Sequence, residues 1–146
     1  MPSTTEVRDR DAQGALAVSL TELLTLLATH LGPVDWHILQ LKAVGAEWGD
    51  TDLDALHERI QKSPSGTPID PEELFQLAGE LERVDDALLC VPASGATPRR
   101  PVDDRFYRDC RVALQCVQGE RWSVTSDDVG IHELLRENFQ DVVSSA

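Results

Sequence analysis

The first regular pattern in the chain is a row of leucines at helical spacing. Its members are Leu20, Leu23, Leu24, Leu27 and Leu31. They fall on one face of a helix and therefore predict an amphipathic helix. Ser19 and Glu22 have the spacing of a capping box, in which hydroxyl and carboxylate satisfy free backbone amides reciprocally. Gly32-Pro33 ends the helix, because glycine accepts a left-handed cap and proline cannot continue the hydrogen-bond ladder.

A second helix is predicted from about Asp35 to Trp48. The residues on most of its sides are apolar: Trp36, Ile38, Leu39, Leu41, Val44 and Trp48. A narrow polar strip is formed by His37, Gln40 and Glu47. A helix that is apolar almost all round belongs in the middle of a core.

Two further helices are predicted between residues 51 and 84. The third is short, and Thr51 and Asp54 together mark its start. The fourth begins at Asp70-Pro71-Glu72-Glu73, which combines a cap, a proline at the first helical position and carboxylates at the positive end of the helix dipole. Its buried stripe consists of Leu74, Leu77, Leu81 and Val84.

The pattern changes after Asp86. Residues 87–91 form an apolar run of strand length, and the proline-containing residues 92–104 form an exposed connection. Residues 105–117 fit both a strand and a helix, but the turn at 118–120 and the alternating Trp122 and Val124 favour a hairpin. A last helix, capped by Asp127 or Asp128, runs through Ile131, Leu134, Leu135, Phe139 and Val142.

These elements predict a flexible N-terminal tail at residues 1–12 and a single globular domain at residues 13–146. The predicted fold class is α+β and mostly helical, with about four N-terminal helices, a small antiparallel sheet or hairpin and a C-terminal helix. The alternative is an all-α fold, which requires residues 105–117 to be a helix.

The net charge of the chain indicates which classes of binding partner to expect. The chain has 26 acidic and 13 basic residues among 146, a formal net charge of −13. Residues 47–86 hold 12 acids against 3 bases, which gives −9 for this segment alone. A surface of this sign repels phosphate backbones, so we expect no direct nucleic-acid binding. It attracts basic partners, or alternatively serves only to keep the protein soluble.

Small size, local acidity and the lack of a catalytic motif in the sequence favour a non-catalytic interaction protein: an inhibitor, an immunity-type protein, an adaptor or an assembly factor. We expect a protein partner with a basic surface, and a homodimer is also open. The expected contact residues form an acidic face: Asp50, Asp52, Asp54, Glu58, Glu72 and Glu73. In a sharper form of the hypothesis, this face mimics the phosphates of a nucleic acid.

Five arginines stand within 13 residues: Arg99, Arg100, Arg105, Arg108 and Arg111. Phe106 and Tyr107 lie among them. Guanidinium groups recognise carboxylates and phosphates, and aromatic rings support stacking. One interpretation is therefore a contact site for an anion or an acidic peptide. The other is internal pairing with Asp103, Asp104, Asp109 and the acidic 47–86 segment.

The alternative function is a small enzyme or ligand-binding domain, with a pocket between the helices and the hairpin. The candidate walls are Trp36, Trp48, Trp122 and Tyr107, and the candidate acid–base groups are His37 and His132. No catalytic residue, metal site or cofactor is assigned, because the histidines and cysteines lack metal-ligand spacing and no phosphate-binding loop is present in the sequence.

The three cysteines, Cys90, Cys110 and Cys116, are too few for a disulfide framework, so we expect free thiols in the core. The sequence contains no apolar run long enough to span a membrane and no convincing secretion signal. We therefore expect a cytoplasmic protein without membrane contact.

Overall fold

The computed structural model describes residues 3–14, 16–45 and 53–145, apart from the side chains of residues 44, 45, 53–55, 57 and 145. The strands are β1 (Ser3–Val7), β2 (Trp36–Gly45), β3 (Thr67–Ile69), β4 (Leu81–Pro92), β5 (Cys110–Val117), β6 (Arg121–Ser126) and β7 (Val142–Ser145). The helices are α1 (Leu20–Leu31), α2 (Leu53–Gln61), α3 (Pro71–Glu80), α4 (Asp104–Arg108) and α5 (Val129–Asn138).

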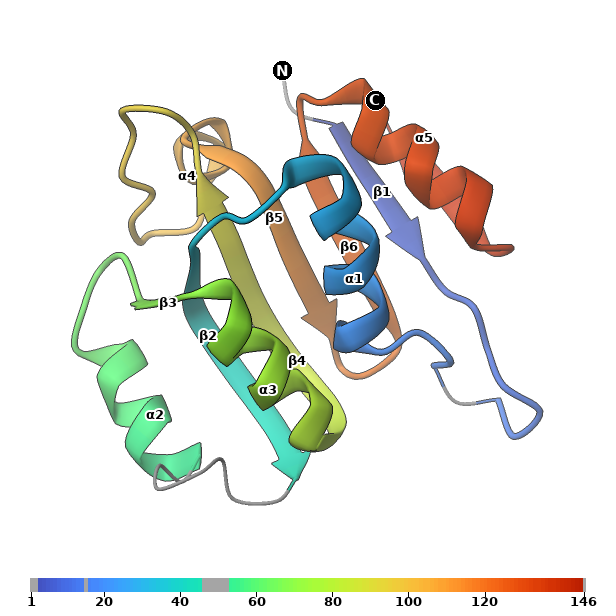
Figure 1. The fold of residues 1–146 in the computed structure, drawn as a ribbon, viewed down its shortest axis with the longest axis horizontal. Coiled ribbons are helices and arrows are strands. Elements are labelled where there is room, and N and C mark those ends of the chain that lie inside the picture. Colours follow the sequence, from blue (N-terminus) through green and yellow to red (C-terminus); the bar gives the residue numbers. More distant parts are fainter. Residues whose placement is uncertain (1–2, 15, 46–52, 146) are drawn as a thin grey trace.

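The strands form one seven-stranded sheet in the order β3-β2-β4-β5-β6-β1-β7. All of its neighbouring strands are antiparallel. Strands β5 and β6 are joined by a tight turn, whereas β1 and β2 lie near opposite edges of the sheet, with β4, β5 and β6 between them. Helix α1 therefore carries the chain across the sheet between β1 and β2 (Figure 1).

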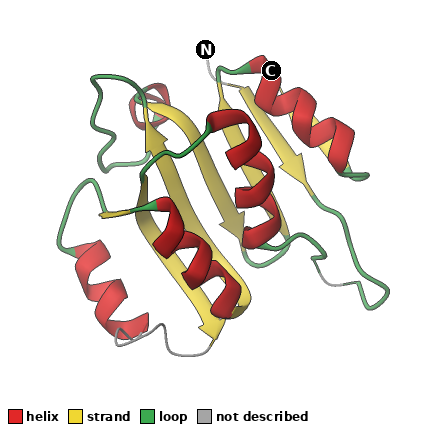
Figure 2. Cartoon of the chain, in the orientation of Figure 1, coloured by secondary structure: helices red, strands yellow, loops and turns green. Residues whose placement is uncertain are grey.

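Helices α1, α3 and α5 lie on one face of the sheet (Figure 2). Alternate residues of the strands point toward them and form the main core, whose largest fully buried side chain is Trp122. The opposite face carries a much smaller apolar cluster: Leu39, Leu88, Cys90, Phe106, Cys110 and Ala113. Phe106 brings the short helix α4 to this cluster, so the two faces of the sheet are covered very unequally.

The predicted starts of the first, fourth and last helices are confirmed by their caps, whereas Thr51, predicted to start the third, lies outside the described residues. The Ser19 hydroxyl accepts a hydrogen bond from the Glu22 amide, and the Asp70 carboxylate accepts one from the Glu73 amide. Asp128, one of the two candidates, caps α5 through the Gly130 amide. These contacts are local in sequence, which is why the residue pattern predicts them.

The predicted fold class is wrong. The structure is 33% helix and 37% strand, and is built on a seven-stranded sheet rather than on a helical core with a small hairpin. The all-α alternative fails for the same reason. Residues 3–7, predicted to lie in a flexible tail, form strand β1 between β6 and β7.

The largest error concerns the predicted helix at 35–48, because residues 36–45 form strand β2. A continuous apolar run is typical both of a buried helix and of a strand covered on two faces. In β2, Ile38 lies in the main core while Leu39 lies in the smaller cluster. A bulge between Ile38 and Gln40 breaks the strict alternation that would have indicated a strand. Trp48 lies outside the described residues.

Three other boundaries move. The last helix, predicted to run through Phe139 and Val142, ends at Asn138, and Val142 begins strand β7. The fourth helix ends at Glu80, and Leu81, predicted to continue its stripe, begins strand β4. Residues 105–117 contain a helix followed by a strand, since α4 ends at Arg108 and β5 begins at Cys110. The alternation of Val112, Leu114 and Cys116 therefore belongs to β5, whereas the helical spacing that continues from Phe106 to Val117 does not correspond to a helix.

Candidate functional site

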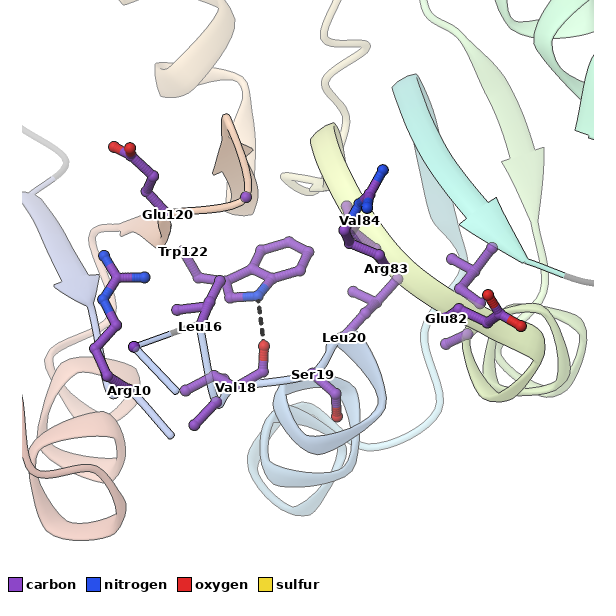
Figure 3. Close-up of a pocket in the computed structure, with 15 residues that line it drawn as sticks. Arg10, Leu16, Val18, Ser19, Leu20, Glu82, Arg83, Val84, Glu120 and Trp122 are labelled. Atoms are coloured by element: carbon purple, nitrogen blue, oxygen red, sulfur yellow. Dashed lines mark hydrogen bonds between the residues drawn. The ribbon is translucent and has the colours of Figure 1, made fainter. Parts of the chain in front are cut away.

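A pocket of about 330 Å³ opens between the start of α1, the end of α3 and the turn that joins β5 to β6. Its walls are mainly apolar and include Leu16, Val18, Leu20, Leu81, Val84 and Trp122. Figure 3 places Leu16 and Leu20 beside the Trp122 ring, with the charged side chains farther out. The pocket lies between helices and the hairpin, where the sequence hypothesis of a ligand-binding domain expects one, and that function stays a prediction.

Trp122 holds one wall of this pocket in place. It points into the main core because the side chains of β6 alternate between the two faces of the sheet. Its indole Nε1 donates a hydrogen bond to the Val18 carbonyl at 3.0 Å, drawn as a dashed line in Figure 3. This bond fixes the segment before α1 against the hairpin, and the Ala17 amide also bonds to the Asp9 carbonyl.

Four charged side chains belong to the pocket: Arg10, Glu82, Arg83 and Glu120. All four residues are exposed. Arg83 is neutralised locally, because its Nε lies 2.8 Å from Oδ1 of Asp85. Among the described residues, the Glu82 and Glu120 carboxylates have no ion-pair partner. With Arg10 as the remaining cation, the pocket has a net negative rim.

The pocket offers little for covalent or acid–base chemistry. Among the lining residues, Ser19 carries a hydroxyl group. The hydroxyl oxygen already accepts a hydrogen bond from the Glu22 amide, because Ser19 caps α1. No histidine or cysteine is among the lining residues that the structure describes. The arrangement is suited to holding an apolar group and contacting charges around it.

Other residues of the sequence hypotheses lie elsewhere. Trp36 is buried in the main core, and Tyr107 lies on α4. The His37 ring donates from Nδ1 to the Ser65 carbonyl at 3.1 Å. His132 is buried, where its Nε2 donates to the Ser126 carbonyl and its Nδ1 accepts from the Thr5 hydroxyl. Both histidine rings thus make hydrogen bonds within the protein.

The residues of the predicted acidic face are only partly described. Asp50 and Asp52 lie outside the described residues, and Asp54 lies on α2 with its side chain outside them. Glu58 is exposed on α2, and Glu72 and Glu73 are exposed in the first turn of α3. None of the six is among the lining residues of the pocket, which lies at the other end of α3.

The arginine cluster is divided among different roles. Arg100 donates to the carbonyls of Ser63, Leu39 and Ile60, so its guanidinium stabilises the end of α2 and the loop after it. Arg99, Arg100 and Arg105 contribute to an open groove of about 610 Å³.

The other two arginines do not join that groove. Arg108 lies on α4 and Arg111 is exposed on β5. In the described part of the chain, none of the five arginines forms an ion pair with Asp103, Asp104 or Asp109.

The three cysteines are buried and unbridged, as predicted. Burial raises the pKa of the Cys116 thiol to about 11. A hydrogen bond to Cys90, followed by burial, raises the pKa of the Cys110 thiol well above its ordinary value. The Cys110 and Cys116 thiols therefore remain protonated at neutral pH, because their pKa values are raised, and this disfavours a nucleophilic role for these two residues.

Two further observations concern metal binding and membrane-spanning helices. The described residues contain no group of three or more histidine, cysteine, aspartate or glutamate side chains placed to hold a metal ion. The described helices include none with the length and apolarity needed to cross a membrane.

Comparison with known proteins finds no matching family model, no matching curated protein and no matching solved structure.

Proposed function

We propose that the protein is a non-catalytic interaction protein that receives an apolar side chain of a basic partner protein in the pocket beside Trp122. The observation that carries this proposal is an apolar pocket with two unneutralised carboxylates, Glu82 and Glu120, at its rim. The partner contributes an exposed leucine, phenylalanine or tryptophan with lysine or arginine beside it.

Two physical contributions support the proposal: the apolar pocket anchors a side chain of the partner, and the negative charge attracts the partner. Burial of a large apolar side chain contributes about 1.5–3 kcal/mol, enough for an anchor but not for a whole interface. The negative charge of residues 47–86, a net −9, would steer a basic partner toward the molecule. Glu82 belongs to this acidic segment, so the long-range attraction and the local rim charge have the same sign.

The competing function is a ligand-binding domain that takes a small apolar molecule into the same pocket. The observation in its favour is the position of the pocket between the helices and the hairpin, with Trp122 in its wall. It differs from the proposed function in one respect: an uncharged apolar ligand does not need Glu82 or Glu120.

Short peptides distinguish the two functions. Each peptide carries a central leucine, phenylalanine or tryptophan, flanked either by lysines or by glutamates, and its binding is followed through the NMR signal of the Trp122 indole N–H. Lysine-flanked peptides are expected to shift this signal and glutamate-flanked peptides are not. Added salt should weaken the binding, since the Debye length falls from about 8 Å at physiological ionic strength to about 3 Å at 1 M.

Two variants test the site itself. Ala17→Arg places a long side chain at an exposed lining position and should abolish the shift, whereas Ala12→Arg adds the same charge at an exposed position outside the pocket. Glu82→Gln with Glu120→Gln should weaken only the lysine-flanked peptides. Equal binding of both peptide sets, or equal effects of the two alanine variants, would contradict the proposed function.

A further inference from the structure

A second, polar groove of about 470 Å³ lies on the face of the sheet that α1, α3 and α5 leave open. It is lined by Thr4, Asp104, Tyr107, Arg108, Gln115, Ser123 and Thr125. Its volume falls within the roughly 300–1,000 Å³ typical of small-molecule sites. The groove is on the opposite side of the sheet from the Trp122 ring.

The floor of this groove follows from strand alternation and register. On β6, Ser123 and Thr125 alternate with the buried Trp122 and Val124, so their side chains point away from the main core. Thr125 pairs with Thr4 of β1, and their hydroxyl oxygens lie 3.0 Å apart. Neighbouring strands thus present a continuous patch of hydroxyl groups.

Helix α4 forms the wall. Phe106 is 1% exposed and fastens the helix to the small apolar cluster on this face. The next residue, Tyr107, donates a hydrogen bond from its hydroxyl to Oε1 of Gln115 at 3.3 Å. Its ring stands edge-to-face against Phe106, with 5.4 Å between the ring centroids. The phenol is therefore held in position beside the hydroxyl-lined floor.

Several polar groups around the groove make no bond to any described residue. The Ser123 hydroxyl and the Gln115 NH₂ group are two of them. On α4, the Asp104 carboxylate and the terminal nitrogens of Arg108 are also unbonded, since Arg108 uses only Nε, toward the Asp104 carbonyl. The groove therefore provides donors and acceptors together with an aromatic ring.

The charges of the groove cancel, because Asp104 and Arg108 are its ionisable residues of opposite sign. We propose that this groove binds an uncharged, polyhydroxylated small molecule such as a sugar. Adjacent hydroxyl groups of such a ligand donate to the Asp104 carboxylate and accept from the Arg108 guanidinium. Each sugar hydroxyl can also exchange hydrogen bonds with Ser123 and Gln115.

An anionic ligand fits the groove less well. A phosphate ester would gain the attraction of Arg108 but would meet the Asp104 carboxylate on the same helix, four positions earlier. A purely apolar ligand would leave the hydroxyl, amide and charged groups without partners, which is unfavourable for each group that it desolvates. A neutral ligand rich in hydroxyl groups can donate to the carboxylate and accept from the guanidinium, and so satisfies both charged groups.

The probes for this proposal are glucose, galactose and mannose, with glucose 6-phosphate as the charged counterpart. Each is titrated to roughly 50 mM into isotopically labelled protein, a range that detects millimolar affinity. We expect at least one neutral hexose to shift the backbone amides of Ser123, Thr125 and Gln115, while the Trp122 indole stays unchanged. Glucose 6-phosphate should bind more weakly than glucose.

Matched variants separate binding from folding. Asp104→Asn and Arg108→Gln should each weaken sugar binding about tenfold, because each removes a charged hydrogen-bonding partner. Glu133→Gln and Arg59→Gln make the same changes at exposed positions on α5 and α2 and should leave it unaltered. Unchanged amide spectra outside the groove confirm that the variants are folded.

Three results would overturn the proposal: no neutral hexose shifts the groove amides, glucose 6-phosphate binds more tightly than glucose, or the α4 variants bind like wild type. The peptide experiment on the Trp122 pocket has a different reporter and lies on the other side of the sheet. Failure of one site therefore leaves the result for the other unaffected.

Discussion

The two faces of the sheet differ in what their side chains do, although the same strands supply both. Toward α1, α3 and α5, the strands contribute a continuous apolar core that includes Trp122, Val124 and Leu114. Toward the open face, the neighbouring positions Ser123, Thr125 and Gln115 are polar and half-buried. The first face therefore supplies most of the apolar core, while the second combines a small apolar cluster with polar side chains that can contact a ligand.

The largest expected difference concerns Trp122 and Phe106, the two largest side chains that are less than 2% exposed, one on each face of the sheet. Trp122→Ala should destabilise the protein by about 5 kcal/mol, because it creates a cavity in the main core and removes the bond to Val18. Phe106→Ala should cost about 3 kcal/mol, since its cluster is small and α4 can settle into the space. Urea unfolding measures both. Equal costs would mean that the small cluster is as important to stability as the main core.

A pair of threonines provides a second, smaller contrast. Thr5 is fully buried and donates to Nδ1 of His132 at 2.6 Å, whereas Thr125 lies on the open face. Thr5→Val should cost about 1–3 kcal/mol because it leaves a buried imidazole nitrogen without a donor. Thr125→Val should stay within about 0.5 kcal/mol. If the two substitutions have the same effect on the unfolding midpoint, the open face carries more of the stability than its exposure indicates.

Two helix caps, one on each face of the sheet, provide a third comparison of the faces. Asp70→Ala removes the cap of α3 and should cost about 1 kcal/mol, whereas Asp103→Ala, at the five-residue helix α4, should cost about 0.5 kcal/mol. Denaturant titration with Glu72→Gln as a control distinguishes the cap from a general loss of negative charge. A larger effect at Asp103 would show that α4 contributes more to folding than its length indicates.

The smallest effect on stability is expected when the pH is lowered. Asp128 accepts a hydrogen bond from His30 at 2.8 Å, which joins α5 to α1, and this bond holds the pKa of Asp128 below its ordinary value of 3.8. A carboxyl group with a lowered folded-state pKa stabilises the protein above its unfolded-state pKa. That contribution is lost as the pH falls through the folded-state value.

Hydrogen exchange of α5 amides between neutral pH and about pH 3 measures this loss. Wild type should lose protection there at the low end of the range, and Asp128→Asn should show a smaller change. Protection around α4 should respond equally in both proteins. A wild-type response identical to that of Asp128→Asn would mean that the pair does not secure the helix layer.

Residue pattern alone predicted the features that depend on near neighbours in sequence. Ser19, Asp70 and the turn at 118–120 fall into this group, and so do the free cysteines. Strand β2 does not, since an apolar run such as 36–45 becomes a strand only when β3 and β4 are available to pair with it. The position of β1 also depends on β6, more than a hundred residues away in the chain.

The candidate sites were predictable only in part. Trp122 could be identified as a pocket wall because it follows a turn in an alternating segment. The polar groove could not, because Thr4, Gln115 and Ser123 are ordinary residues until the sheet order places their strands side by side. Their alternation with buried neighbours was the available signal, and it marks an exposed face without indicating what that face binds.

Arg100 has a consequence for how the length of this chain can change. Its backbone amide donates to the Pro64 carbonyl, and its guanidinium reaches the carbonyls of Ser63 and Leu39. The connection between β4 and α4, residues 93–103, is thus fastened near its C-terminal end by Arg100, and Phe106 fixes the helix that follows. Inserted residues should be tolerated near Gly95, which is exposed in the turn after β4, and should disrupt the protein between Arg100 and Phe106, where both ends of the segment are fixed.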